Sequence, residues 1–273
     1  MAILRPLRYQ VHDGRILTWS LEAHVTDHCN LRCAHCCTLS PELPARCVSP
    51  EDLSRDLSLA ARGLAPAVFK LTGGEPTLHP RLAECAERAR ESGIAQRVSL
   101  TSNGFRLADA ADALFDALDE LTLSLYTSAP LGDSRLERIA RRCEDHRVAL
   151  RVKWIDRFAR MDAEPPYRAP GETLGVYRRC WLRERCHMIR EGRFYACTRP
   201  PHLAVVLERR GEPGAASLAE VDGVSLDQPD LAARLQRYLE REEPLAACGY
   251  CLGGDGAFEP HLQRGRAPLG IPA

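Results

Sequence analysis

Four cysteines fall within nine residues near the start of this chain, in the stretch VTDHCNLRCAHCCTLSP at residues 25–41. Cysteines at this density constrain the fold, because their thiols must either be joined as disulfides or bind a metal centre. The cluster by itself leaves three kinds of structure open: a disulfide knot, a zinc site and an iron–sulfur site.

Length and charge narrow these choices. The chain has 273 residues, enough for one large domain or for one domain with a small appendage. Its 37 lysine and arginine residues balance 37 aspartate and glutamate residues, so the composition indicates no basic surface for nucleic acid or an anionic membrane. The first residues do not resemble a signal peptide, and no apolar run approaches the roughly 20 residues of a membrane-spanning helix. We therefore expect a cytoplasmic protein with a small-molecule or peptide partner, whose 12 cysteines stay as thiols unless they are metal ligands or catalytic.

The first part of the chain alternates short strand-like runs with helical patterns, which is typical of parallel βα units. The expected strands are residues 20–26, 67–72, 97–102, 121–126 and 149–155. Apolar residues at helical spacing follow the first four strands, at residues 49–64, 80–93, 107–120 and 132–146. Ser49 is placed to cap the first helix, with Pro50 at its first position. This order predicts an α/β fold, a partial TIM-type barrel of five or six βα units, over residues 18–156.

The expected strands alternate polar and apolar side chains, whereas parallel strands covered on both faces usually carry continuous apolar runs. One face collects apolar residues that suit packing beneath the helices: Ala23, Val25, Phe69, Leu71, Val98, Leu100, Leu123, Leu125, Val152 and Trp154. The other face collects polar residues: Glu22, His24, Lys70, Ser99, Thr101, Ser124, Tyr126, Arg151 and Lys153. We expect the polar face to line a substrate cavity inside an open barrel; the alternative is an ordinary charged sheet surface. Lys70 and Lys153 are the only lysines in the chain.

The rest of the chain divides into smaller segments. Residues 157–172 are rich in proline and mixed charges, which predicts a linker or lid loop. Residues 173–258 carry a second group of cysteines, with an expected hairpin at 187–198 that turns at Glu191 and Gly192, and an expected helix at 229–245. Residues 1–17 form an N-terminal extension, and the tail at 259–273 has no assigned role.

Cys29, Cys33 and Cys36 have the spacing CxxxCxxC directly after the first expected strand, so three thiolates can converge at the C-terminal mouth of the barrel. Three ligands on a cubane iron–sulfur cluster leave one iron open, whereas a structural zinc site takes four ligands. Cys37 is a candidate fourth ligand, but adjacent cysteines rarely both reach one ion. The spacing therefore favours an iron–sulfur cluster.

Three motifs together resemble a known superfamily. CNLRCAHC resembles the cluster-binding signature CxxxCxΦC of the radical S-adenosylmethionine (SAM) superfamily, with His35 at the usually aromatic position. LTGGEP at residues 71–76 resembles the second motif of that superfamily, and TSNG at residues 101–104 resembles the third. Each motif follows a consecutive expected strand, in the superfamily's order.

This resemblance implies two cofactors and assigns residues to them. Cys29, Cys33 and Cys36 are implied to ligate a [4Fe-4S] cluster whose fourth iron binds SAM. The residues implied to contact SAM are Gly73, Gly74, Glu75, Ser102, Asn103, Ser124 and His35. Among them, the glycines would admit backbone groups to the methionine moiety, and Glu75 would accept from its ammonium group. Reductive cleavage of SAM would give a 5'-deoxyadenosyl radical that abstracts hydrogen from a substrate.

A second set of cysteines, Cys180, Cys197, Cys248 and Cys251, forms the pattern C-x16-C-x50-C-x2-C. Four thiolates can bind zinc or a fully ligated cluster, and the pattern does not separate the two. The arrangement resembles the twitch auxiliary domain, a short form of the SPASM domain, as in the radical SAM dehydrogenase of butirosin biosynthesis. It implies one auxiliary [4Fe-4S] cluster in a small hairpin-plus-helix domain, with Cys186 as the alternative to Cys180.

The resemblance implies a radical SAM oxidoreductase that dehydrogenates or epimerises a small polar metabolite, such as a sugar or aminocyclitol alcohol. Loss of the hydroxyl proton needs a base or a cation nearby, and the candidates are Lys153, Arg151, Tyr126 and Lys70. An external one-electron donor such as flavodoxin or ferredoxin is implied as a partner. The alternative is a maturase that crosslinks or oxidises a ribosomally made peptide, although few residues precede the first strand, where such enzymes often carry a leader-binding domain.

Overall fold

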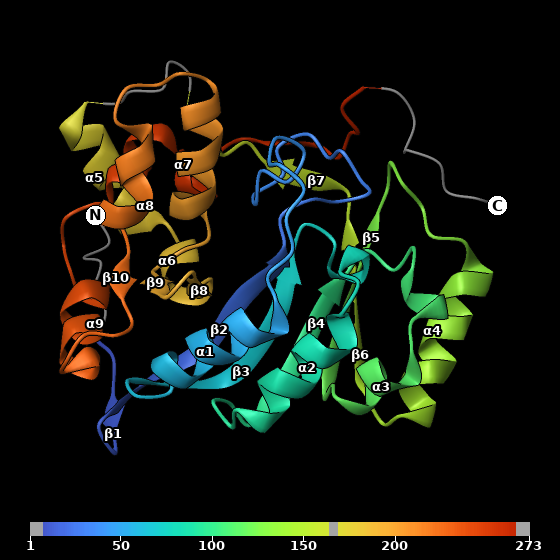
Figure 1. Cartoon of the computed structure of the whole chain (residues 1–273). Helices are drawn as coiled ribbons and strands as arrows, with labels where there is room; N and C mark the ends of the chain where they lie inside the picture. The colour runs from blue at the N-terminus through green and yellow to red at the C-terminus, as the bar shows by residue number, and fades with distance from the viewer. Residues whose placement is uncertain (1–7, 164–168, 266–273) are drawn as a thin grey trace.

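The computed structural model describes residues 8–163 and 169–265. Five parallel strands in its centre match the expected ones: β2 (Arg15–Thr26), β3 (Leu64–Gly73), β4 (Arg97–Ser102), β5 (Glu120–Tyr126) and β6 (Ala149–Ile155). The connecting helices lie along one side of these strands (Figure 1): α1 (Pro50–Ala60), α2 (Leu82–Glu91), α3 (Asp112–Asp116) and α4 (Asp133–Asp145). The strand order of the described sheet runs from β10 to β6 without closing, so the expected partial barrel is confirmed.

Local interactions explain where two of the helices begin and end. At α1, the Ser49 hydroxyl accepts from the backbone N–H of Asp52 at 3.0 Å, as expected for its cap. The helix expected at 107–120 is shorter, because only a 3₁₀ turn, η2 (Leu107–Asp109), and α3 form there. The backbone carbonyls of Ala108 and Ala110 accept from the Arg142 guanidinium of α4, which takes the place of helical N–H donors.

The apolar face of the sheet packs beneath the helices except at its last strand. Leu71 and Leu100 illustrate the eight expected core residues that are buried. Val152 and Trp154 are 38% and 77% exposed, so the prediction was wrong for these two. They lie on β6, the terminal strand of the described sheet, which has a neighbouring strand on one side only.

The region after β6 extends the same sheet. β8 (Met188–Arg190) and β9 (Arg193–Tyr195) form the expected hairpin, with φ of 52° and 71° at Glu191 and Gly192. β8 also pairs in parallel with β2, where Met188 lies opposite Glu22. The hairpin and β10 (Val224–Ser225) therefore continue the barrel sheet at its β2 edge.

Short helices gather around this hairpin, on the left of Figure 1: α5 (Pro170–Arg179), α6 (Leu182–Arg185), α7 (Arg199–Arg209), α8 (Leu218–Val221) and α9 (Leu231–Leu239). No helix was expected at α7; its Pro200 and Pro201 lie in the first turn, where proline is tolerated. The remaining elements are β1 (Val11–His12), β7 (Arg157–Ala159), β11 (Phe258–Pro260), η1 (Pro76–Leu78), η3 (Ala215–Ser217), η4 (Ala246–Tyr250) and η5 (Gly253–Asp255). In the described ranges, no helix is long and apolar enough to cross a membrane. Residues 164–168 of the expected lid loop, residues 1–7 of the N-terminal extension and residues 266–273 of the tail lie outside the described residues.

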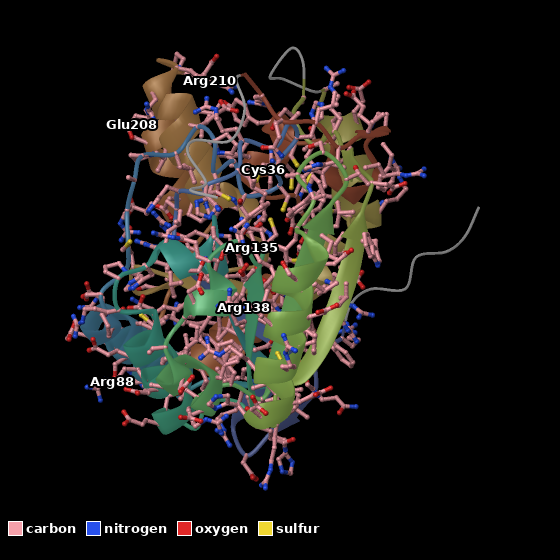
Figure 2. The ribbon with its side chains drawn as sticks, turned by 90° about the vertical axis from the view of Figure 1, so that its right-hand side faces the viewer. Cys36, Arg88, Arg135, Arg138, Glu208 and Arg210 are labelled. Carbon is pink, nitrogen blue, oxygen red and sulfur yellow. The ribbon has the colours of Figure 1, made fainter. Side chains whose placement is uncertain are left out.

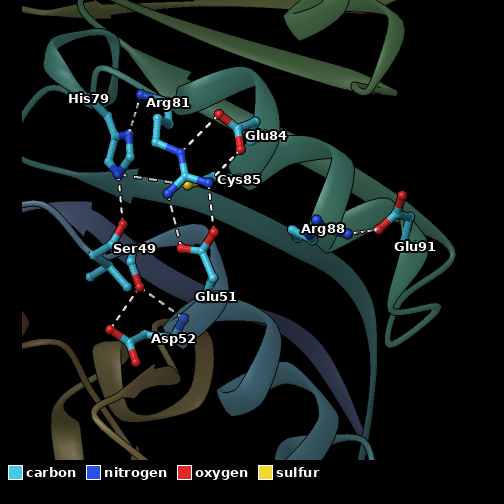
Figure 3. A network of polar contacts seen from close by, with 10 residues as sticks. Ser49, Glu51, Asp52, His79, Arg81, Glu84, Cys85, Arg88 and Glu91 are labelled. Atoms are coloured by element: carbon cyan, nitrogen blue, oxygen red, sulfur yellow. Dashed lines mark hydrogen bonds and ion pairs between the residues drawn. The ribbon is translucent and has the colours of Figure 1, made fainter.

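A polar network joins α1 to α2 (Figure 3). Arg81 donates to Glu51 of α1 at 2.6 and 3.0 Å and to Glu84 of α2 at 2.6 and 2.9 Å. His79 accepts from the backbone N–H of Arg81 at 2.9 Å through Nδ1, so its Nε2 carries the proton and donates to the carbonyl of Val48 at 2.7 Å. Burial lowers the pKa of His79, which favours this neutral form. The histidine thus ties the loop after β3 to the chain that leads into α1.

A buried ion pair joins β8 to the end of β2. The Arg190 guanidinium donates to both carboxylate oxygens of Asp27, at 2.6 and 2.8 Å, and the two side chains are 7% and 3% exposed. Asp27 lies two residues before Cys29, so this pair fixes the start of the cysteine loop to the hairpin.

We expect Arg190→Leu to lower the free energy of unfolding by about 3 to 5 kcal/mol, because it leaves the Asp27 carboxylate buried without its bidentate partner. Urea unfolding followed by circular dichroism measures the loss. The control is Arg88→Leu, which removes an exposed pair with Glu91 and should change the unfolding midpoint little. Equal midpoints for the two variants would contradict the role of the buried pair.

Candidate functional site

The cysteine loop begins where β2 ends, at the C-terminal end of the parallel strands. Several sulfur atoms gather around Cys36 at this end of the sheet (Figure 2). Burial raises the pKa of the Cys33 thiol to about 11, with an opposing hydrogen bond from Gln263 and a smaller contribution from Cys36. Burial and the nearby Glu75 carboxylate raise the pKa of Cys29 as well. Such thiols ionise when a bound cation compensates their charge, as a metal centre does.

Two backbone hydrogen bonds hold the cysteine loop to the end of β3. The N–H of Gly74 donates to the carbonyl of Thr26 at 2.8 Å, and that of Glu75 donates to the carbonyl of His28 at 3.0 Å. No side chain fits in this contact. A Cβ atom on Gly73 would lie 2.2 Å from the carbonyl oxygen of Thr26, and a Cβ atom on Gly74 would lie 2.0 Å from the carbonyl oxygen of His28. The two glycines therefore serve the packing of the motif loops on each other, a role that the sequence did not reveal.

The buried carboxylate of Glu75 joins the second motif to the third. One oxygen accepts from the hydroxyl and N–H of Thr77 at 2.6 and 3.1 Å and from the Ser102 hydroxyl at 2.7 Å. The other oxygen accepts from the N–H of Asn103 at 2.7 Å. Burial raises the pKa of Glu75, and these four donors oppose that shift. The structure thus brings Glu75, Ser102 and Asn103 together, with both oxygens of Glu75 already bonded within the protein.

Asn103 connects the third motif to the cysteine loop. Its side-chain amide donates to the Asn30 side chain at 2.7 Å and lies 3.8 Å from the Cys29 sulfur. Asn30 was not among the residues expected from the sequence. In the sequence, only its position directly after Cys29 could have pointed to Asn30. A polar residue next to a cysteine is too common to identify a functional residue.

The segment at residues 257–265 lies against the cysteine loop, although the sequence suggested no role for the tail that begins at residue 259. Strand β11 pairs with β7, which brings the segment back across the mouth of the barrel. Beyond β11, the N–H of Ala34 donates to the carbonyl of Leu262 at 2.8 Å. The described part of the tail is therefore part of the site.

Gln263 makes the most direct contact of this segment. It lies opposite Cys33 in an antiparallel bridge, and its side-chain oxygen accepts from the N–H of Arg32 at 2.7 Å. Its side-chain amide donates to the Cys33 sulfur at 3.4 Å. An N–H···S hydrogen bond of this kind is a contact that tunes metal-bound thiolates.

Two further pairs fasten the same segment. His35 has φ of 57°, and its Nε2 lies 2.9 Å from the Glu259 carboxylate. His261 stacks on Tyr126, with ring centroids 4.7 Å apart and planes inclined by 22°. Tyr126 lies within electrostatic reach of Cys33, Cys36 and Cys29. The structure thus places Tyr126 beneath the C-terminal segment, beside the cysteine loop, while Ser124, two residues earlier on β5, is buried.

Cys180, Cys197, Cys248 and Cys251 come together in the C-terminal region. Burial raises the pKa of Cys197 well above its ordinary value, and Cys248, Cys180 and Cys251 all contribute. Burial also raises the pKa of Cys248 to about 12, with contributions from Cys251 and Cys180. Cys186 is within electrostatic reach of Cys180 but lines the cavity described below.

Neither group of thiols is arranged around a single point. Across residues 8–163 and 169–265, no three His, Cys, Asp or Glu side chains are placed to share one metal ion. A structural zinc site brings four ligands to about 2.3 Å from one ion, whereas a cubane binds each cysteine through a different iron and keeps the sulfurs farther apart. Three thiols at the barrel mouth and four in the C-terminal region are donor sets of the kinds that cubane clusters take, and the second set also has the ligands of a zinc site.

A cavity of about 950 Å³ lies on the polar face of the sheet. Residues from β2, β3, β4 and β6 that the sequence assigned to that face line it, namely Glu22, His24, Lys70, Ser99, Thr101, Arg151 and Lys153. The expected polar interior is thereby confirmed for these strands, while Ser124 and Tyr126 lie outside the lining. Two thiols that were not expected there, Cys37 and Cys186, also line the cavity.

Comparison with known sequences identifies related proteins. The sequence model of the Radical SAM superfamily matches residues 24–164, more than half of the chain. The GTP 3',8-cyclase of Streptomyces coelicolor is 36% identical over 124 residues, which cover 43% of this chain and 35% of that protein. The GTP 3',8-cyclase of Mycobacterium marinum is 38% identical over 118 residues, which cover 42% of this chain and 32% of that protein. The chain thus spans about a third of the length of these curated relatives.

Comparison with solved structures gives weaker likenesses. The crystal structure of BtrN in complex with AdoMet and 2-DOIA has a TM-score of 0.46 and 13% identity, covering 87% of this chain and 94% of that one. Native anSMEcpe with bound AdoMet and Cp18Cys peptide has a TM-score of 0.37 and 19% identity, covering 50% and 42% of the two chains.

We expect Gln263→Leu to make the midpoint potential of a reconstituted cluster more negative, because a hydrogen bond to a ligand sulfur stabilises the reduced, more negative state. An EPR-monitored redox titration measures the potential, and iron analysis shows whether the loop still holds its cluster. Gln228→Leu makes the same change beside Asp227 at the surface and serves as the control. A wild-type potential in Gln263→Leu would contradict the contact between Gln263 and a ligand sulfur.

Proposed function

Because this chain belongs to the radical SAM superfamily, we propose that it is a radical SAM oxidoreductase that dehydrogenates or epimerises an alcohol carbon of a small polar metabolite, such as a sugar or aminocyclitol. The observation that carries the proposal is the direct contact of three motif loops beside a polar cavity. The N–H of Gly74 donates a hydrogen bond to the carbonyl of Thr26, just before the cysteine loop. The side-chain amide of Asn103 donates to Asn30 within that loop. The cavity of about 950 Å³ lies within the usual range for small-molecule sites.

When bound, a [4Fe-4S] cluster and SAM supply a 5'-deoxyadenosyl radical for hydrogen abstraction, and an auxiliary [4Fe-4S] cluster supplies an acceptor for the second electron. In this proposal, Cys29, Cys33 and Cys36 hold the first cluster. The residues around SAM are Gly73, Gly74, Glu75, Ser102, Asn103, Ser124 and His35. An external donor such as flavodoxin or ferredoxin supplies the first electron.

Glu75 has a more specific part in this proposal than direct contact with SAM. Its carboxylate already accepts four hydrogen bonds from Thr77, Ser102 and Asn103. We therefore assign Glu75 to positioning the second and third motifs, so that their backbone groups face the cofactor. His35, held by Glu259, has the same kind of role in the cysteine loop.

The C-terminal thiols decide between the two outcomes at the substrate carbon. Cys180, Cys197, Cys248 and Cys251 are proposed to hold the auxiliary cluster in a twitch-like unit, which suits dehydrogenation. Epimerisation instead needs a hydrogen donor, and Cys186 is a thiol on the cavity wall. Placing Cys186 on that wall favours Cys180 as the cluster ligand.

Loss of a hydroxyl proton during dehydrogenation requires a base or a cation at the reacting carbon. Lys153, Arg151 and Lys70 line the cavity and are the candidates for this role. Burial lowers the pKa of Lys153, and the charges of Lys70 and Arg151 lower it further. Tyr126 is a weaker candidate than these three, because it lies beneath His261 and outside the cavity lining.

A second candidate function follows from the curated relatives, whose names describe a reaction on GTP. A nucleotide would also fit the volume of the cavity. The matched part of this chain holds the SAM motifs, which many reactions share, so the metabolite alcohol stays our first proposal. A peptide maturase is the third, since a peptide side chain can enter the same cavity.

We expect anaerobically reconstituted wild-type protein to hold about eight irons, two cubanes, and to release 5'-deoxyadenosine from SAM under reducing conditions. The triple variant Cys29→Ala, Cys33→Ala, Cys36→Ala should keep about four irons and form no 5'-deoxyadenosine, because only the auxiliary thiols remain. Iron and sulfide analysis and chromatography of the SAM products measure these values. Cys143→Ala, which removes a buried thiol from α4, is the control and should behave like wild type.

Two outcomes would contradict parts of this proposal. Wild-type protein with intact clusters that leaves SAM uncleaved would overturn the radical chemistry. A triple variant that loses all its iron and binds zinc at the C-terminal cysteines would remove the auxiliary cluster, and the redox-neutral reaction would replace dehydrogenation.

A further inference from the structure

Three cationic side chains line the cavity, and those of Arg151 and Lys153 are open to solvent. Lys70 projects from β3, and Arg151 and Lys153 project from β6, across the two strands between them. Their charges interact, because both Lys70 and Arg151 contribute, after burial, to the lowered pKa of Lys153. Glu22 of β2 is the carboxylate whose charge reaches Lys153. Three cations facing one carboxylate leave an excess of two positive charges.

The other charged residues of the lining do not offset this excess. Arg97 and Glu120 form an ion pair with each other. Glu184 and Arg185 of α6 add one charge of each sign, and the Arg185 guanidinium lies over the Trp19 ring at 5.3 Å. The positive charge of the cavity therefore resides at the three cations on β3 and β6.

In the part of the chain that the structure describes, Lys70, Arg151 and Lys153 make no hydrogen bond or ion pair. Like charges held close together without a counterion raise the free energy of the folded protein, and an anion bound among them removes that cost. The proposed dehydrogenation needs only one base or cation to assist loss of the hydroxyl proton. Three cations are more than this step requires.

The choice of lysine at two of these positions adds to the argument. Lys70 and Lys153 are the only lysines among 37 basic residues, and both lie in this cavity. An ammonium group is a compact charge that approaches a phosphate oxygen from any direction, while the Arg151 guanidinium offers a fork of parallel donors. One fork and two point charges suit a group with several equivalent oxygens.

We propose that the cavity binds a substrate that carries a phosphate group, held by Lys70, Arg151 and Lys153. A phosphate monoester carries close to two negative charges at pH 7, which matches the excess, whereas one carboxylate would leave a positive charge uncompensated. This assignment of a substrate class rests on the proposed function, in which the cavity binds the substrate. Within the proposed function it favours a phosphorylated sugar or a nucleotide over an aminocyclitol, whose charge is an amine.

The position of the cavity suits an anchored substrate. Thr72, directly before the motif glycines, lines it, and so do Cys37 and Thr38, which follow Cys36. A molecule held at the cations therefore extends along the polar face toward the cofactor loops. A phosphate at one end would orient the reacting carbon at the other, as binding energy remote from the reaction does in other enzymes.

Isothermal titration calorimetry on the reconstituted full chain, with inorganic phosphate as the probe, tests this inference. We expect Lys70→Gln and Lys153→Gln each to weaken phosphate binding about tenfold, because each removes a charge-assisted hydrogen bond. Arg55→Gln, on the exposed face of α1, is the matched control and should bind like wild type. Malonate, a dicarboxylate of similar charge, should bind more weakly than phosphate to the wild-type protein.

Each other outcome overturns the inference: no phosphate binding by wild type, equal binding by wild type and the lysine variants, or equal binding of malonate and phosphate. Circular dichroism and iron content show that the variants are folded and loaded. The assay of 5'-deoxyadenosine without substrate keeps the two proposals apart. Intact SAM cleavage with no phosphate binding contradicts only the substrate class, and phosphate binding without SAM cleavage contradicts only the radical reaction.

Discussion

The contact between the ends of β2 and β3 is the interaction on which the rest of the site depends. Two backbone hydrogen bonds, from Gly74 to Thr26 and from Glu75 to His28, bring the chains so close that neither motif glycine has room for a Cβ. This contact places the cysteine loop above the strand ends. The Glu75 carboxylate then carries the same constraint to the third motif through Ser102 and Asn103. The three motifs form one bonded unit, so a change in any of them is transmitted to the thiols.

Segments from the far end of the chain complete this unit. Arg190 of the hairpin holds Asp27 below the cysteine loop, while Gln263 and Glu259 bond the loop from the side of the C-terminal segment. The cysteine loop is therefore enclosed by residues about 160 to 230 positions away in sequence. The hairpin also continues the barrel sheet, and Cys197 of the second thiol group follows its strand β9 by two residues. A cluster held there would lie within the same folded body as the first.

Much of the fold could be predicted from alternation and helical spacing, because these patterns report directly which face of an element is buried. Strands β4 and β6 begin and end at the expected residues, and Ser49 caps α1 as its side chain suggests. The exposure of Trp154 could not be predicted, since a pattern shows that a face is apolar and not whether another layer reaches it.

The candidate site also has features that could be predicted from the sequence and features that only the structure shows. The polar lining around Lys70 and Lys153 follows from strand period, and the order of the motifs follows from the βα repeat. The contact of Gln263 with Cys33 depends on how a long chain returns to the barrel mouth. No local pattern encodes such a long-range contact. For Glu75 the motif indicated the residue, but only the structure shows its four donors.

The most direct test of the central claim, that the Cys29 loop holds a cluster that binds SAM, is the EPR spectrum of the reduced, reconstituted protein before and after addition of SAM. The account predicts that SAM changes the signal of one cluster and leaves the signal of the auxiliary cluster unchanged. In the triple cysteine variant, SAM should change nothing. A wild-type spectrum that stays the same when SAM is added would contradict the assignment of the cysteine loop as the cofactor site.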